Sequence, residues 1–281
     1  MKNNFVDLHV HSFYSDGTMS PLEIAEKAKE HNLGFLAIAD HDVLKGSIEL
    51  AKLLEKTDIR YVSAVEIDTV YDNKNFHILA YGIDLKNIEF GSYVNKIRST
   101  MDNYSVELIR NMANDYPKLS LIEYKNFTHN VYLGGWKALQ YLLHKGITNN
   151  LKEGVRFYGK YTKGLPEYPS ITDVCRKIKY FSGYSVLAHP GELIDQTNIK
   201  SFETELTKIL PMGIDGIECY YPTHSCEITV LCINICNEND LLITAGTDCH
   251  GTFGKTRVGE INIEIGKLNI EKLTGNNSFR S

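Results

Sequence analysis

Two histidines separated by one residue, His9 and His11, close the first apolar run of the chain and constrain its fold more than any other feature. Alternate residues of a strand point to the same face, so the two imidazoles can bind one metal ion. Imidazole together with carboxylate suits zinc, manganese or iron. The sequence therefore predicts a site for two or three metal ions, because further histidines and carboxylates follow later strand-like runs: Asp16, Asp40-His41-Asp42, Glu66, His77, His189 and Asp248-Cys249-His250.

Strand and helix signals alternate through residues 5–85 and again through 171–247. The all-apolar run Phe35–Ala39 is typical of a buried parallel strand, and Ser20-Pro21-Leu22-Glu23 carries the cap, first-turn proline and glutamate of a helix start. Parallel strands with crossover helices form a closed barrel or an open doubly wound sheet. We favour a barrel, because ligands at the carboxyl ends of many strands converge when the strands form a ring.

Residues 91–168 interrupt this alternation. Amphipathic helices are expected at 92–115 and 136–145, and no strand pattern lies between or directly after them. The expected fold is thus an α/β barrel domain made of residues 1–90 and 169–281, with a helical insertion at 91–168. Strands at 61–66 and 76–82 are expected to pair partly as a hairpin across Asp72-Asn73.

The order and spacing of these segments resemble the PHP (polymerase and histidinol phosphatase) family of metal-dependent phosphoesterases. The resemblance rests on Asp7-Leu-His-Val-His11, Tyr14-Ser-Asp-Gly17, Ala39-Asp-His-Asp42, Val65-Glu66, Phe76-His-Ile78, Leu187-Ala-His-Pro190 and Gly246-Thr-Asp-Cys-His250. It implies a distorted seven-stranded TIM-like (β/α)7 barrel. It also implies three ligand sets: His9, His11, Glu66 and Asp248; a bridging Glu66 with His77 and His189; and Asp16, His41 and His250.

Within that family, the Ser-Asp-Gly form at 15–17, the chain length and the insertion are similar to the branch that removes phosphate from nucleotides. Members of that branch act on 3′,5′-bisphosphonucleosides, and some degrade short RNAs. The resemblance implies a phosphatase for a small nucleotide such as a 3′,5′-bisphosphonucleoside or AMP. One departure concerns the insertion, where an Arg-x-His segment that binds phosphate is common in the branch. The comparable stretch here, Phe127-Thr-His-Asn-Val131, has no arginine.

The expected chemistry needs no catalytic side chain beyond a metal-bound hydroxide. Two neighbouring ions lower the pKa of a bridging water, and the ions neutralise the phosphate oxygens. Manganese, zinc and iron all fit the donor set, and magnesium is compatible with it. Asp40 and Asp42 flank His41, and each is expected either to hydrogen-bond a ligand imidazole or to be a solvated turn carboxylate.

Contacts with the substrate are expected from Lys255 and Arg257, which follow the Asp248-His250 segment and could clamp a second phosphate. The alternative is that they are ordinary surface charges. His224 and His129 are further candidates for substrate binding. Trp136 could stack on a base, although aromatic residues that pack helices together are commoner.

Other functions share the same residues. A 5′–3′ exonuclease on short RNA or DNA would use the same metals, but a long strand favours a basic groove and the net charge is −5. A histidinol-phosphate-type phosphatase usually differs where this chain has Tyr14–Gly17. A non-catalytic metal-binding domain remains an alternative that the intact ligand set disfavours. An amidohydrolase typically uses a bridging lysine where Glu66 stands here.

No stretch approaches the ~20 apolar residues of a membrane span, and residues 1–4 lead straight into a strand without a signal-peptide core. The expected location is cytoplasmic and the expected partner is a small phosphorylated substrate, with short RNA as an alternative. The sequence leaves the oligomeric state open.

Overall fold

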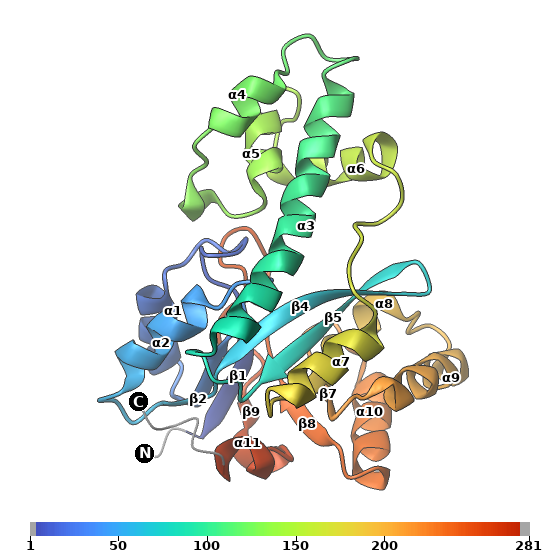
Figure 1. Ribbon diagram of the computed structural model, residues 1–281. Helices are drawn as coiled ribbons and strands as arrows, with labels where there is room; N and C mark the ends of the chain where they lie inside the picture. Colours follow the sequence, from blue (N-terminus) through green and yellow to red (C-terminus); the bar gives the residue numbers. More distant parts are fainter. Residues whose placement is uncertain (1–3, 276–281) are drawn as a thin grey trace.

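The computed structural model describes residues 4–275, which form a mixed α/β fold with two β-sheets (Figure 1). The first sheet has the order β3 (Arg60–Tyr61), β2 (Leu33–Ile38), β1 (Phe5–Val10) and β9 (Ile263–Glu264). The second has the order β4 (Ala64–Tyr71), β5 (Lys74–Tyr81), β6 (Tyr184–Leu187), β7 (Gly216–Tyr220) and β8 (Leu242–Ala245). The predicted α/β class is confirmed.

Isolated bridges join both edges of the second sheet to the inner strands β1 and β2 of the first sheet. Val10 pairs with Cys249 beyond β8, and His41 beyond β2 pairs with Glu66 in β4. Backbone bonds reinforce both junctions: the His11 N–H donates to the Cys249 carbonyl at 2.9 Å, and the Asp42 N–H donates to the Glu66 carbonyl at 2.9 Å. Within residues 4–275 the ladders do not close into one continuous ring, so the seven-stranded barrel stays a prediction.

Strand direction departs from the predicted parallel pattern at one side of the second sheet, where β5 is antiparallel to both of its neighbours. β4 and β5 form an antiparallel hairpin, as expected across Asp72-Asn73, and both turn residues have positive φ (47° and 59°). Such angles match the twist of a two-residue hairpin turn. β5 is also antiparallel to β6. Glu66 was expected at the carboxyl end of a strand ending at 66. It lies instead near the start of the longer β4, because the hairpin continues to Tyr71.

Helices cover the outer faces of the sheets (Figure 1). α1 begins after Ser20, whose side chain accepts from the Glu23 N–H while the Glu23 carboxylate accepts from the Ser20 N–H, so the predicted capping box is present. Apolar side chains of the strands pack against these helices and form the core. The helices are α1 (Pro21–Glu30), α2 (Lys45–Leu54), α7 (Ile171–Tyr180), α8 (Pro190–Leu193), α9 (Ile199–Ile209), α10 (Cys226–Glu238) and α11 (Glu271–Gly275).

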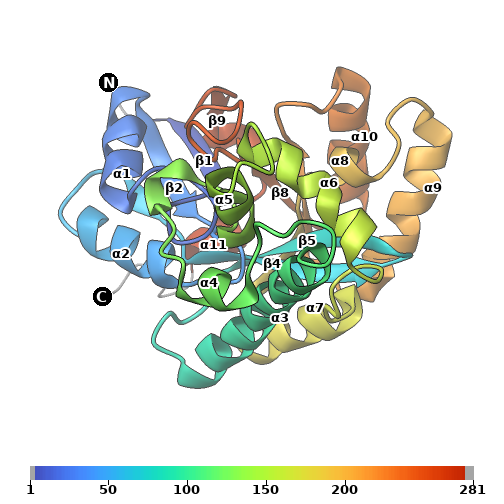
Figure 2. The same ribbon diagram turned by 90° about the horizontal axis from the view of Figure 1, so that it is seen from above.

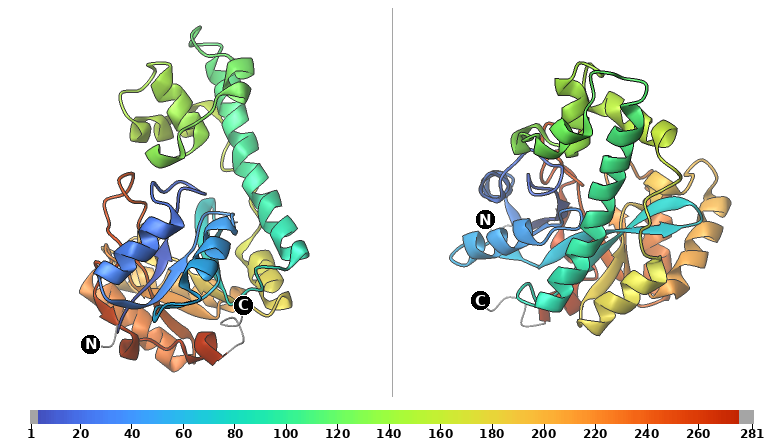
Figure 3. Two further views of the ribbon diagram at one scale, coloured as in Figure 1. Left: turned by 90° about the vertical axis from the view of Figure 1, so that its left-hand side faces the viewer. Right: turned by 45° about the horizontal axis from the view of Figure 1, so that its top comes forward.

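The segment between β5 and α7 is helical and lies above the strands, as Figure 2 and the left view of Figure 3 show. It comprises the long α3 (Ile88–Met112), α4 (Leu121–Asn126), α5 (Lys137–His144) and α6 (Leu151–Tyr161). α3 and α5 match the two helices expected at 92–115 and 136–145, whereas α4 and α6 were not predicted. A backbone bond from the Gly135 N–H to the Asp16 carbonyl, at 2.8 Å, ties this segment to the loop after β1.

Short 3-10 helices accompany these elements. Two lie outside the helical segment, at Leu210–Met212 and Ile265–Lys267, and a third lies within it, at Val131–Leu133. The helices of residues 4–275 include none with the length and apolar character needed to traverse a lipid bilayer.

Two helical glycines should respond oppositely to alanine. A Cβ on Gly46 would lie 2.0 Å from Asp40 Oδ2 and 2.7 Å from Ile38, so Gly46→Ala should lower the free energy of unfolding by about 1–3 kcal/mol. Gly159, in exposed α6, has nothing within 4 Å, and Gly159→Ala should raise it by about 0.5–1 kcal/mol. Urea denaturation of both variants measures this. A Gly46→Ala protein as stable as the parent would contradict the close packing of α2 on the Asp40 loop.

Candidate metal centre

The first cluster contains His9, His11, Glu66 and Asp248, whose ligand atoms all lie within 4.8 Å of one another. The Nε2 atoms of both histidines are 3.1 Å from Glu66 Oε2 and 3.1 Å from each other. Asp248 Oδ1 is 3.0 Å from His11 Nε2. The structure thus brings together the four residues that the family resemblance places on one ion.

Glu66 also faces a second group of imidazoles with its other oxygen. His77 Nδ1 and His189 Nε2 are each 3.0 Å from Glu66 Oε1 and 3.3 Å from each other. His41 Nδ1 lies 3.4 Å from Glu66 Oε2 and belongs with Glu66 and His77 to a compact group. Glu66 therefore stands between the two sets, which is the position expected of a bridging carboxylate.

A third group contains Asp16, His41 and His250, with His11 as a fourth member that the sequence did not predict there. Asp16 Oδ1 is 3.2 Å from His250 Nε2. The rings of His11 and His250 stack with centroids 4.0 Å apart, which brings the first and third groups into contact. The three groups form one continuous cluster of imidazoles and carboxylates.

Some polar atoms of this cluster lack hydrogen-bond partners. Four buried ligand atoms make no hydrogen bond within the described part of the chain: Asp16 Oδ1, His41 Nδ1, Glu66 Oε2 and Asp248 Oδ1. A buried polar atom without a partner costs free energy, so its retention needs a compensating interaction. Lone pairs from imidazole and carboxylate that face one small space are the donor set of a divalent transition metal. The residues present fit such ions.

The charges of the cluster also favour bound cations. Burial disfavours protonation of His11, but the carboxylates of Asp248 and Glu66 outweigh it and raise its pKa to about 10. Burial likewise opposes protonation of His9, and Glu66 and Glu218 raise its pKa well above the ordinary value. The carboxylates thus draw positive charge into the cluster, where bound cations would take the place of these protons.

Two carboxylates that the sequence analysis did not single out hold cluster imidazoles in place. Glu218, fully buried in β7, has Oε1 3.0 Å from His9 Nδ1, and its Oε2 accepts from the His189 N–H at 2.9 Å. Asp68 Oδ1 lies 3.1 Å from His77 Nε2. Such contacts fix the ring orientation and tautomer of metal ligands. An acidic residue inside an apolar strand was the available signal for Glu218.

Asp40 and Asp42 take different positions from those expected, since neither bonds a cluster imidazole among the described contacts. Asp40 accepts hydrogen bonds from the Ser12 N–H, the Ser12 hydroxyl and the Ser15 hydroxyl, each at 2.7 Å. Asp42 Oδ1 accepts from the Asp68 N–H at 3.3 Å. Both are buried rather than solvated. Asp40 therefore holds the loop that follows His11 and leads to Asp16.

Three segments of the cluster adopt unusual backbone angles. His189, Asp248 and Asp42 all have positive φ, at 25°, 51° and 51°. Residues other than glycine rarely adopt such angles unless the surrounding structure holds them, and they gather at functional sites. His189 and Asp248 follow the ends of β6 and β8, and Asp42 follows His41 beyond β2. The strained angles therefore fall in the turns that carry or adjoin members of the cluster.

The four substrate-binding candidates do not come together. Lys255 and Arg257 are exposed on the loop after His250. His224 Nε2 accepts from the Gly191 N–H at 3.1 Å and its Nδ1 is 3.1 Å from the Cys219 carbonyl, so both ring nitrogens are bound to the main chain. A ring held in this way stabilises the turn after β7. His129 lies in the helical segment, where it lines a cavity.

The sequence matches a known protein family. Residues 7–214 match the PHP domain, and the chain belongs to that family. A phosphoribosyl 1,2-cyclic phosphate 1,2-diphosphodiesterase from Eggerthella lenta is 26% identical over 89% of this chain and 95% of its own. A 5′-3′ exoribonuclease from Haemophilus influenzae is 23% identical over 90% and 93%. A 3′,5′-nucleoside bisphosphate phosphatase from Chromobacterium violaceum is 25% identical over 87% of each chain.

The fold has a solved counterpart. A candidate metal-dependent phosphoesterase from Bifidobacterium adolescentis superposes with a TM-score of 0.73 over 91% of each chain, at 24% identity. This likeness concerns the fold. Family membership and the three relatives support a phosphoric ester hydrolase activity, and the family implies divalent metal ions in a cluster of this kind.

The role of Glu218 can be tested through metal affinity. Glu218→Gln keeps the size of the side chain but removes the negative charge beside His9 Nδ1, so manganese or zinc affinity should fall by about 10–100-fold. Competition with a chromophoric chelator measures the affinity. Glu203→Gln, at an exposed position of α9, is the matched control and should bind as the parent does. Equal affinities in the two variants would remove Glu218 from the metal centre.

Proposed function

We propose that this protein is a metal-dependent phosphatase that hydrolyses phosphomonoesters of a small nucleotide, such as a 3′,5′-bisphosphonucleoside or AMP. The observation that carries the proposal is the position of Glu66, a fully buried carboxylate whose two oxygens face two different groups of imidazoles. The similarity to a 3′,5′-nucleoside bisphosphate phosphatase supports the nucleotide as substrate.

Nine residues would hold two or three divalent ions, with manganese, zinc or iron as the preferred metals. We assign His9, His11, Glu66 and Asp248 to one ion, Glu66, His77 and His189 to a second, and Asp16, His41 and His250 to a third. His11 and His41 also lie close enough to neighbouring groups to be shared. When bound, such ions lower the pKa of a water and neutralise charge on phosphate oxygens.

The protein's own residues would orient the ligands and screen the site. Glu218 and Asp68 hold the non-ligating nitrogens of His9 and His77, and the Tyr221 hydroxyl donates to Asp248 Oδ2 at 3.0 Å. Most of the cluster is buried, so an ester that reaches it would be shielded from bulk water. Recognition of the rest of the substrate would fall to residues outside the cluster.

The chain would divide this work between two parts. We assign residues 1–90 and 169–281 to a catalytic domain, a distorted seven-stranded barrel of which the two sheets are segments, and 91–168 to a cap. The support for the cap is its place above the strands and its bond to the Asp16 carbonyl (Figure 2). A cap in this position would choose the substrate.

A second candidate is a 5′–3′ exonuclease on short RNA. The observation that favours it is the similarity to the Haemophilus influenzae exoribonuclease over 90% of this chain. The same metal cluster would serve both reactions, since each hydrolyses a phosphoric ester. The net charge of −5 favours the smaller substrate.

Phosphate release decides between these functions. The manganese-loaded protein should release phosphate from adenosine 3′,5′-bisphosphate or AMP, and His9→Ala should reduce the rate at least 100-fold because it removes one of the proposed ligands. His31→Ala, an exposed histidine outside the cluster, is the matched control and should keep full activity.

The panel also includes histidinol phosphate and a 5′-phosphorylated RNA pentamer. Preferential shortening of the RNA would replace the phosphatase with the exonuclease. Turnover of histidinol phosphate alone would move the substrate to the other branch of the family. Metal binding without turnover of any of the four compounds would contradict the proposed function.

A further inference from the structure

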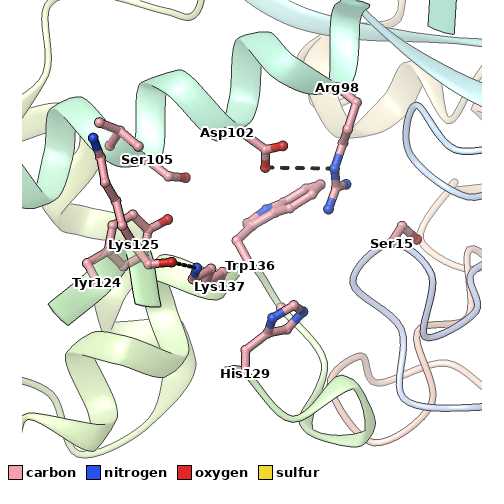
Figure 4. A pocket seen from close by; sticks show the side chains of 11 residues that line it. Ser15, Arg98, Asp102, Ser105, Tyr124, Lys125, His129, Trp136 and Lys137 are labelled. Carbon is pink, nitrogen blue, oxygen red and sulfur yellow. Dashed lines mark hydrogen bonds and ion pairs between the residues drawn. The ribbon is translucent and has the colours of Figure 1, made fainter. Parts of the chain in front are cut away.

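The helical segment contains a cavity of its own, separate from the metal ligands. It has a volume of about 380 Å³ and lies between α3, α4 and the loop before α5, with Ser15 from the loop after β1 at one end (Figure 4). No proposed metal ligand lines it. Small-molecule sites have volumes of about 300–1,000 Å³, so this cavity is large enough to hold part of a ligand.

The charged side chains around the cavity are mostly cationic. Arg98, Lys125 and Lys137 line it, against the single carboxylate of Asp102. The ion pair between Arg98 Nε and Asp102 Oδ1 is long, at 4.0 Å, and the Asp102 side chain is 69% exposed, so it neutralises little of this charge. Burial, together with Lys137 and Arg98, lowers the pKa of His129. The cavity is therefore electropositive in a chain of net charge −5.

Trp136 gives the cavity a flat aromatic wall, and it positions the arginine. The Arg98 guanidinium lies 4.6 Å from the centre of the Trp136 ring, a cation–π contact that holds the arginine beside the ring (Figure 4). Arg98 Nη1 also donates to the His41 carbonyl at 3.4 Å. A guanidinium has five N–H donors in a planar fork, so further donors remain for an anion.

The cavity adjoins the metal centre. The ring of Trp136 is 5.8 Å from that of His41, and Arg98 contacts the backbone of the same histidine. Ser15, at the near end, donates to Asp40 and lies 3.4 Å from His11 Nδ1. A ligand with one phosphate at the metals could thus extend directly into the cavity. Lys125 and Tyr124 line it on α4, further along (Figure 4).

We propose that this cavity is a second anion subsite that binds the non-reacting phosphate of the substrate, with Arg98 as the specificity-determining residue and Trp136 as the wall beside the base. The proposal rests on the proposed function, because it places the reacting phosphate at the metal centre. The cations come from α3, α4 and the start of α5, and not from the stretch 127–131, which has no arginine.

Trp136 makes the subsite directly observable, because it is the single tryptophan of the chain. Its fluorescence should change when adenosine 3′,5′-bisphosphate is titrated into the chelator-treated, full-length protein, where the metals no longer attract phosphate. Adenosine, which has the base but no phosphate, should need at least tenfold higher concentrations for the same change.

Two variants and one control locate the phosphate. Arg98→Ala should raise the half-saturating bisphosphate concentration by about tenfold or more, and Lys125→Ala by a smaller factor. No described contact joins Lys125 to a proposed metal ligand, so its variant keeps the test valid if loss of the His41 contact disturbs Arg98→Ala. Arg110→Ala, which removes an exposed arginine from the same helix α3, should bind as the parent does.

Kinetics of the manganese-loaded enzyme give a second readout. Arg98→Ala should raise KM for the bisphosphate by about tenfold with a smaller change in kcat, and should change KM much less for a monophosphate, which has no second phosphate to lose. Arg98→Lys keeps the charge but not the planar fork, and should fall between parent and alanine variant.

The outcomes separate this proposal from the proposed function. Equal half-saturation by adenosine and by the bisphosphate would overturn the subsite, as would parent-like binding in both Arg98→Ala and Lys125→Ala. Phosphate release with KM values unaffected by these variants would leave the phosphatase standing and reject the subsite. Fluorescence changes that depend on Arg98 and Lys125, without phosphate release, would support the subsite and reject the phosphatase.

Discussion

The structure is organised around the burial of one carboxylate. Glu66 has no solvent exposure, and imidazole nitrogens of four histidines surround it at 3.0–3.1 Å: His9, His11, His77 and His189. An ionised carboxylate inside a protein costs several kcal/mol unless positive charge accompanies it. Protonated imidazoles or metal ions can supply that charge, and the unpaired lone pairs around Glu66 favour metals. The strands must then deliver histidines from β1, from β5 and from the turn after β6 to one point.

The ligands come from separate strands, so the loop at each strand end must be held in position. Further buried carboxylates hold these loops. Asp40 binds the loop after β1 through Ser12 and Ser15. Asp7 accepts hydrogen bonds from the Thr247 N–H and hydroxyl and from the Gly259 N–H, so it fixes the start of the segment that carries Asp248. Glu218 joins His9 to the backbone of His189. The loops are thus held by buried polar networks, and a fully satisfied network of this kind specifies a single arrangement.

Sequence patterns were informative where chemistry repeats locally. Spacing along a strand predicted that His9 and His11 share a face, and the capping residues predicted the start of α1. The same reasoning missed Glu218, because a single acid within an apolar strand has no periodic signal. It also placed Glu66 at a strand end, since alternation cannot show how far a hairpin extends. The sequence analysis missed Arg98 for a different reason. An arginine on an amphipathic helix is expected to lie on the solvated face, and only the structure shows its contact with Trp136.

The proposed cap would explain how an acidic chain can suit an anionic substrate. Net charge describes the field at long range, whereas Arg98, Lys125 and Lys137 line one cavity, and partial burial of Arg98 and Lys137 weakens screening of their charges by solvent. Arg98 also donates to the carbonyl of His41, so the side chain that would recognise a second phosphate already contacts a proposed metal ligand. Recognition and hydrolysis would therefore share one structural element, and a substrate that fills the cavity would hold its reacting phosphate at a defined distance from the metals. Contacts with the second phosphate would then act mainly by strengthening substrate binding, because they are made equally before and during the reaction at the first phosphate.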